Sequence, residues 1–215
     1  MGRMRRVLGA ALFCAALSGL APAMAAPAGA GIFAFGGEAA SHDARSLVHW
    51  IARRADNEGL PFAIVDKKAA RIHVFDRRGR LVGSSSALLG QAIGDDSAPE
   101  VGDHAQTGKV PIAERTTPAG RFVSEPGLNL HGEPVVWVDY AAAFAIHRLR
   151  PGASRGKREV RLASLAPADH RVSLGCVVVP EPFYKDVVQR LLGRSRAVVY
   201  VLPESRAVHE VFGAL

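Results

Sequence analysis

A cysteine in a glycine-containing turn is the residue of this chain best suited to covalent chemistry. Cys176 lies in "HRVSLGCVVVP" (170–180), after Gly175 and before three valines that predict a short buried strand. A thiol attacks as the thiolate, so near neutral pH an ordinary pKa of about 8.5 requires a base or a positive charge beside it. The position predicts either a nucleophile or a small, buried and inert core residue.

Histidine is the obvious base, and the chain has eight. His147 ends the apolar run "AFAI", and the end of a strand on a rigid scaffold can hold a side chain in a site. His170 is the alternative, because it precedes the thiol by six residues and a local loop could fold it back. We expect His147 to be the base and keep His170 as a possible substrate-binding residue.

The surrounding pattern predicts a mainly β, β-rich α+β domain. Three short strands are expected in 61–90, with turns at "KKAA" and "RRG", and more strands in "AGRFVSEPG", "EPVVWVDY", "AFAIHRL", "CVVV" and "RAVVYVL". Two peripheral helices are expected, in 41–59 after Ser41 and in 181–193 before Gly193. The stretches 90–118 and 151–171 show no clear period and read as loops, the first a candidate lid.

The first 25 residues predict a secretory signal peptide. "MGRMRR" is basic, the apolar run that follows is too short to span and remain in a membrane, and "AMA" is a small-residue cleavage site. Cleavage would remove Cys14, so Cys176 would be the sole thiol, in the periplasm or at the cell surface, with no membrane span left. The expected organisation is a signal peptide (1–25), a flexible leader (26–40), an N-terminal helix (41–59), a catalytic domain (60–203) and a C-terminal tail (204–215).

Charge, length and the motifs that are not found narrow the remaining classes of function. Without residues 1–25, 24 basic residues face 20 acidic ones, a charge of about +4 that suits an anionic polymer such as a cell wall or simply a soluble basic surface. About 190 residues form one domain, expected to be a monomer. We find no ligand spacing for a metal, no phosphate-binding glycine motif for a cofactor and no aromatic-basic pattern for nucleic acid.

Four segments in order resemble the L,D-transpeptidase (YkuD-type) catalytic domain. They are "RIHVFDRRGRLVGSSSALLG" (71–90), "TPAGRF" (117–122), the strand end "IH" (146–147), and "SLGC" (173–176) followed by "VVVP" and a helix. The resemblance spans about residues 60–203 and implies a mixed β-sheet sandwich or barrel-like fold. It also implies that Cys176 attacks a peptidoglycan tetrapeptide stem at the carbonyl of its third residue, with His147 as base and no cofactor. D-Alanine would leave, and an amine would resolve the thioester to cross-link murein.

The resemblance further implies roles for the residues around the thiol. Gly175 would let the N–H groups of Gly175 and Cys176 face the oxyanion, while Ser173 shapes the turn. The main-chain carbonyl of Arg148 would orient His147, and its side chain, larger than usual there, could reach a substrate carboxylate.

Leu174 and Val178 stand where the family generally has polar residues, which affects expected efficiency and acceptor choice. The alternatives are a hydrolytic L,D-carboxypeptidase or amidase acting on murein stems, and a noncatalytic wall-binding module. The acceptor could be a second stem, a lipoprotein, a free D-amino acid or water.

Overall fold

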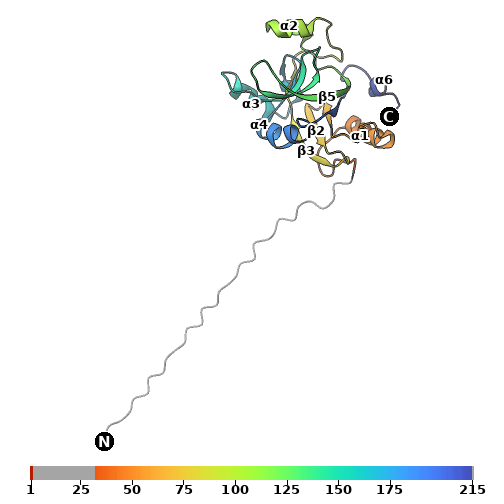
Figure 1. The fold of residues 1–215 in the computed structure, drawn as a ribbon, viewed down its shortest axis with the longest axis vertical. Helices are drawn as coiled ribbons and strands as arrows, with labels where there is room; N and C mark the ends of the chain where they lie inside the picture. Colours follow the sequence, from red (N-terminus) through yellow and green to blue (C-terminus); the bar gives the residue numbers. More distant parts are fainter. Residues whose placement is uncertain (2–31, 215) are drawn as a thin grey trace.

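The computed structural model describes Met1 and residues 32–214 (Figure 1). The expected signal peptide therefore lies outside the described residues, apart from Met1. Within the described part, no helix is long and apolar enough to cross a membrane.

The domain is built on one eight-stranded mixed sheet, which confirms the predicted β-rich fold class. Its strand order is β3-β2-β1-β10-β5-β6-β7-β9, with β1/β10 and β7/β9 parallel and the other neighbours antiparallel. A parallel pair, β4 and β8, forms a second sheet. The strands are β1 (Phe62–Asp66), β2 (Arg71–Phe75), β3 (Leu81–Ser86), β4 (Leu89–Gly90), β5 (Gly120–Leu128), β6 (Pro134–Asp139), β7 (Phe144–Arg148), β8 (Arg171–Ser173), β9 (Val177–Val179) and β10 (Ala197–Val201).

The eight-stranded sheet curls until its two edges nearly meet. Leu88, two residues after β3, exchanges two backbone hydrogen bonds with Val178 in β9, at 2.8 and 2.9 Å. The sheet is therefore almost closed, and little of its edge backbone is left unpaired there.

Helices lie around this sheet, more of them than the sequence indicates. They are α1 (His42–Arg54), α2 (Val101–Thr107), η1 (Ile112–Glu114), α3 (Arg155–Ala163), η2 (Pro167–His170), the continuous run of α4 (Glu181–Phe183), η3 (Tyr184–Val188) and α5 (Gln189–Leu191), and α6 (Val208–Phe212). The stretches read as loops contain α2, η1, α3 and η2. Each of α2 and α3 has only one buried residue, so neither packs an apolar stripe into the core.

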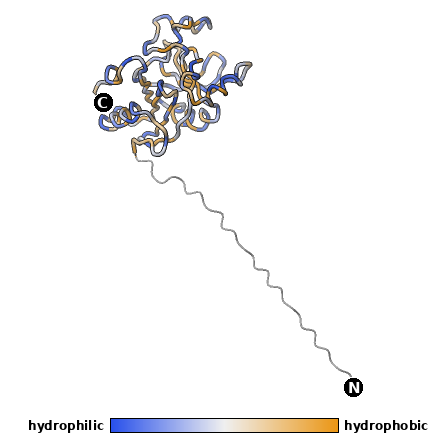
Figure 2. Tube along the Cα trace, turned by 180° about the vertical axis from the view of Figure 1, so that it is seen from behind, coloured by the Kyte–Doolittle hydropathy of each residue, from blue (hydrophilic) through white to orange (hydrophobic). Residues whose placement is uncertain are grey.

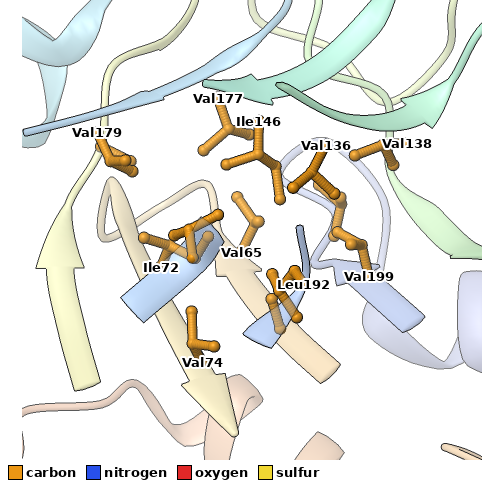
Figure 3. Close-up of a cluster of buried hydrophobic side chains, with 14 of the residues drawn as sticks. Val65, Ile72, Val74, Val136, Val138, Ile146, Val177, Val179, Leu192 and Val199 are labelled. Atoms are coloured by element: carbon orange, nitrogen blue, oxygen red, sulfur yellow. The ribbon is translucent and has the colours of Figure 1, made fainter. Parts of the chain in front are cut away.

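Two apolar clusters fill the two faces of the strands. On one face of β1 and β2, α1 packs through Leu47, Val48 and Ile51, none of which is exposed. On the other face, valines and Ile146 meet Leu192, which follows α5 (Figure 3). In Figure 2, hydrophobic residues gather in the middle of the domain, where these clusters lie, and hydrophilic residues are common in the outer loops.

The described part of the expected leader, residues 32–40, and the expected tail each contain an aromatic side chain that packs on the domain. In the expected flexible leader, Phe35 is only 2% exposed and its ring meets His73 and Phe75 edge-on, at 4.8 and 5.5 Å between ring centres. In the expected tail, Phe212 of α6 packs against Trp50, with 6.3 Å between ring centres. These aromatic side chains bury enough area to hold the chain around Phe35 and around Phe212 on the domain.

Candidate functional site

The turn that carries Cys176 is held by its own serine. Ser173 Oγ accepts a hydrogen bond from the N–H of Gly175 at 3.1 Å and donates to the carbonyl of Cys176 at 2.6 Å. Gly175 has φ +134°, and a Cβ there would lie 2.9 Å from the carbonyl oxygen of Thr116. Only glycine therefore fits this position, because both the conformation and the space exclude a side chain.

One expected oxyanion donor is already used. Because the N–H of Gly175 donates to Ser173, it is not free to bind a developing negative charge, which corrects the two-donor expectation. Among the described residues, the N–H of Cys176 makes no hydrogen bond. The turn thus offers one backbone donor, and a second must come from elsewhere in the site.

His147 lies near the end of β7 with one ring nitrogen fixed. Its Nδ1 lies 2.8 Å from the carbonyl oxygen of Arg148. A carbonyl oxygen only accepts, so Nδ1 carries the proton in the neutral ring and Nε2 is left as the acceptor. Burial lowers the pKa of His147 from 6.5 to about 4, so the ring is neutral near pH 7.

The strand register places the thiol and the imidazole on one face of the sheet. Ile146 pairs with Val177 and His147 with Val178, so extending the register by one residue sets Cys176 beside Ala145. Ala145 and His147 are two residues apart and point the same way. Cys176 and His147 are therefore diagonal neighbours on adjacent parallel strands, with Cα atoms about 8 Å apart from the standard strand spacings.

The thiol is neutral in this arrangement. Burial raises the pKa of Cys176 above its usual value. The thiol contacts the carbonyl oxygen of Ala143 at 3.5 Å rather than hydrogen bonding to His147. A neutral thiol and a neutral imidazole can still react, provided that the proton moves to Nε2 as the sulfur attacks.

The two candidate substrate-binding side chains are engaged elsewhere. Arg148 forms an ion pair with Glu133 at 2.5 Å and lies 3.8 Å from a carboxylate oxygen of Glu181. His170 is 3% exposed, with Nδ1 and Nε2 each 3.1 Å from a main-chain carbonyl oxygen, of Ala87 and Ser164. Arg148 neutralises protein carboxylates and His170 links buried backbone, so neither is free to meet a substrate.

Val178 pairs with His147 on the neighbouring strand, and its side chain packs in an apolar cluster. It is 2% exposed and belongs to a cluster with Leu88, Leu149 and Leu162. The valine thus helps to form the apolar surroundings that lower the pKa of His147.

Thr117 is a buried residue of the site that sequence reasoning did not single out. Its Oγ1 donates to the carbonyl of Gly175 at 2.8 Å and accepts from the N–H of Gly90 at 2.8 Å. Its own carbonyl accepts from Nζ of Lys67 at 2.9 Å. Thr117 is 0% exposed, and its hydroxyl holds Gly175, the residue before Cys176, through the hydrogen bond to the Gly175 carbonyl. The available signal was its place at the start of "TPAGRF".

A buried ion network supports Thr117. Lys67 is 1% exposed, and its Nζ lies 2.7 Å from Asp95 Oδ1 and 3.5 Å from Glu204 Oε1. Burial acts to raise the pKa of Asp95, but hydrogen bonds from Lys67 and from backbone N–H groups of 204–206 lower it to about 2. The network links four distant parts of the chain and carries compensated charge.

An aromatic pair lies in the same row of the sheet as the thiol. Trp137 pairs with Ala145, which in turn is beside Cys176, so all three share one face. The ring of Trp137 meets that of Tyr140 at 5.0 Å, and Tyr140 is 77% exposed. The small side chain of Ala145 thus separates an aromatic wall from the thiol.

The stretch 90–118, read as a candidate lid, packs on the turn beside the thiol. A Cβ on Gly102 of α2 would lie 2.0 Å from the carbonyl oxygen of Ala141, so backbone meets backbone there. Ala143, whose carbonyl contacts Cys176, is two residues further on. Within the described residues, no group of three or more His, Cys, Asp or Glu side chains could hold a metal ion.

Comparisons with known proteins give distant structural likenesses only. No protein-family profile matches the sequence, and no curated protein matches it. A catalytic domain of an L,D-transpeptidase from E. faecium has 18% identity and a TM-score of 0.33, covering 66% of this chain and 95% of its own.

A fused Zn-dependent amidase/peptidase/peptidoglycan-binding protein from Clostridium acetobutylicum has 15% identity and a TM-score of 0.35. That match covers 66% of this chain, which spans only about half (51%) of the Clostridium protein. Scores this low do not assign an activity, so the residues of the site must carry the functional conclusion.

Proposed function

We propose that this protein is a cysteine-dependent acyltransferase acting on peptidoglycan stem peptides, an L,D-transpeptidase. The observation that supports this most directly is the placement of His147. It lies on the strand next to the nucleophile and on the same face as Cys176, with Nδ1 fixed by the carbonyl of Arg148 and Nε2 free to accept a proton. A side chain with a purely packing role would not need one nitrogen fixed and the other free beside a thiol.

The first half-reaction transfers the stem to sulfur. Sγ of Cys176 forms a bond to the carbonyl carbon of the third stem residue while its proton passes to Nε2 of His147. The tetrahedral oxyanion binds the N–H of Cys176, a donor of a kind worth about 10²–10³ in rate. The bond from carbon to the D-alanine nitrogen then breaks, and the imidazolium returns the proton to the leaving amine, which leaves a thioester.

The second half-reaction releases the stem. An acceptor amine attacks the thioester carbon and gives its proton to His147, and the imidazolium protonates sulfur as the carbon–sulfur bond breaks. The thioester keeps the energy of the broken amide, so no cofactor is required. The basic start and the apolar run within residues 1–25 support a location in the periplasm or at the cell surface, where peptidoglycan lies.

The test is incubation with purified tetrapeptide muropeptides, followed by mass spectrometry. We expect a cross-linked dimer and release of D-alanine. Cys176→Ala should abolish the product, and His147→Gln should lower its rate by about 10²–10⁴-fold, the usual contribution of a positioned base. A matched control is His49→Gln, an exposed histidine on α1 that should react normally.

The same assay separates the alternatives. A shortened monomer would assign hydrolysis instead of transfer, and unchanged muropeptide with a folded protein would indicate a noncatalytic wall-binding module. A second readout is covalent addition of a carbapenem to the wild type, which Cys176→Ala should prevent. Absence of both product and adduct would contradict the proposal.

A further inference from the structure

A hollow lined by arginines lies at the turn of the β2–β3 hairpin. It has a volume of about 380 Å³ and is lined by residues of the turn 76–80, by the end of α5, and by Arg194 and Ser195 between α5 and β10. Five of the nine residues that line it are arginines: Arg77, Arg78, Arg80, Arg190 and Arg194. We call these five residues the arginine hollow.

The positive charge of the arginine hollow is largely uncompensated. Arg190 lies 3.5 Å from Asp186 in an exposed pair, but the side chains of the other four form no ion pair or hydrogen bond among the described residues. Asp76 is the one carboxylate lining the hollow. Its Oδ1 accepts hydrogen bonds from the backbone N–H groups of Arg78 and Arg80, at 2.8 and 2.9 Å, so this carboxylate stabilises the turn backbone and, within the described chain, forms no ion pair with the arginine side chains.

The turn that presents these arginines is fixed from behind. The N–H of Phe33 donates to the carbonyl of Gly79 at 2.6 Å. A Cβ on Gly79, which has φ +75°, would lie 2.6 Å from the ring of Phe33. With Asp76 capping the turn from within, the backbone that carries Arg77, Arg78 and Arg80 is held in one conformation. A ligand then orders only side chains, which lowers the entropic cost of binding.

We propose that the arginine hollow is a binding site for phosphate groups. Guanidinium groups match the oxygens of a phosphate in pairs, and several on one concave surface suit a group with more than one negative charge. A single carboxylate would leave most of the five cations unused. The phosphate could belong to a soluble phosphorylated molecule or to a lipid headgroup, because the chemistry of recognition is the same.

The arginine hollow is separate from the candidate active site. The hairpin turn precedes β3, whereas Leu88, which bonds to Val178 beside His147, follows it. The six residues of β3 put about 20 Å between these two ends. In Figure 1, β2 and β3 lie at the lower end of the domain and α2 at the upper end. Ligand binding in the hollow therefore needs no change in the chemistry of Cys176.

The experiment measures binding of pyrophosphate by calorimetry at low ionic strength, with acetate at equal ionic strength for comparison. A parallel arm measures sedimentation with phosphatidylglycerol vesicles and with phosphatidylcholine vesicles. The variant Arg78→Gln/Arg194→Gln removes two charges from the hollow. The matched control Arg53→Gln/Lys157→Gln removes two charges from exposed positions on α1 and α3.

We expect Arg78→Gln/Arg194→Gln to bind at least tenfold more weakly than the wild type, and the control pair to bind as the wild type does. Arg78→Lys/Arg194→Lys, which keeps the charge but loses the paired donors, should fall between them. If the hollow variant binds pyrophosphate more weakly than the wild type, the ligand is a soluble phosphorylated molecule. If it loses binding only to phosphatidylglycerol vesicles, the ligand is a lipid headgroup. Equal binding by wild type and hollow variant in both arms would overturn the proposal, as would an equal loss in the control pair.

Discussion

Replacing Thr117 by valine tests whether the turn that carries Cys176 depends on the hydroxyl of Thr117. Valine keeps the shape of threonine but has no hydroxyl, so the change leaves the N–H of Gly90 and the carbonyl of Gly175 without their partner. A buried polar group left unpaired costs about 1–3 kcal/mol, so two such groups give a loss of about 2–6 kcal/mol in the free energy of unfolding. Thr117→Ser keeps the hydroxyl and should lose less than about 1.5 kcal/mol, the range for removing one buried methyl group.

Urea denaturation followed by tryptophan fluorescence measures the loss of stability. The rate of acyl-enzyme formation measures the effect on the position of Cys176. A displacement of the reacting group by about 1 Å can cost about 100-fold in rate, so Thr117→Val should acylate about that much more slowly while Thr117→Ser stays near the wild type. If Thr117→Val unfolded within 0.5 kcal/mol of the wild type, roughly the spread of neutral surface substitutions, and acylated at the same rate, the support assigned to Thr117 would be wrong.

Three further predictions concern buried charge and titration. Lys67→Met leaves the Asp95 carboxylate buried without its cation and should cost about 3–5 kcal/mol in denaturation, whereas Lys68→Met, on the neighbouring half-exposed lysine, should change little. The unfolded chain binds more protons than the folded chain between about pH 6.5 and 4, because burial lowers the pKa of His73 to about 4 as it does for His147. Stability should therefore fall as pH drops through that window, and His73→Asn should flatten the slope of melting temperature against pH. Acylation should persist down to about pH 4, since His147 remains unprotonated above its pKa, and an acidic limb near pH 6.5 would contradict this.

The strands around the site could be predicted because their signals are local. Alternating and continuous apolar runs in 61–86, 120–148 and 197–201 have the period and length of strands, and the turns "KKAA" and "RRG" join β1, β2 and β3 as expected. The pairing of β7 with β9 was not visible in this way, since 28 residues separate Arg148 from Val177 and register depends on tertiary packing.

The support of the site could not be predicted from residue types. Lys67 and Lys68 are adjacent and chemically identical, yet Nζ of Lys67 is fully buried and the side chain of Lys68 is 52% exposed. Only the fold determines which of them meets Asp95. Likewise, Gly175 was assigned a free N–H because a sequence does not show that Ser173 turns back to occupy it.

The network beneath Thr117 also governs the order in which the site can be completed during synthesis. Asp95 is held by the backbone N–H groups of residues 204–206, which leave the ribosome after His147 and Cys176. A nascent chain that ends at Leu202 already contains the thiol and the imidazole but lacks the clamp on Asp95. Translation would thus delay completion of the site until residues 204–206 have been made.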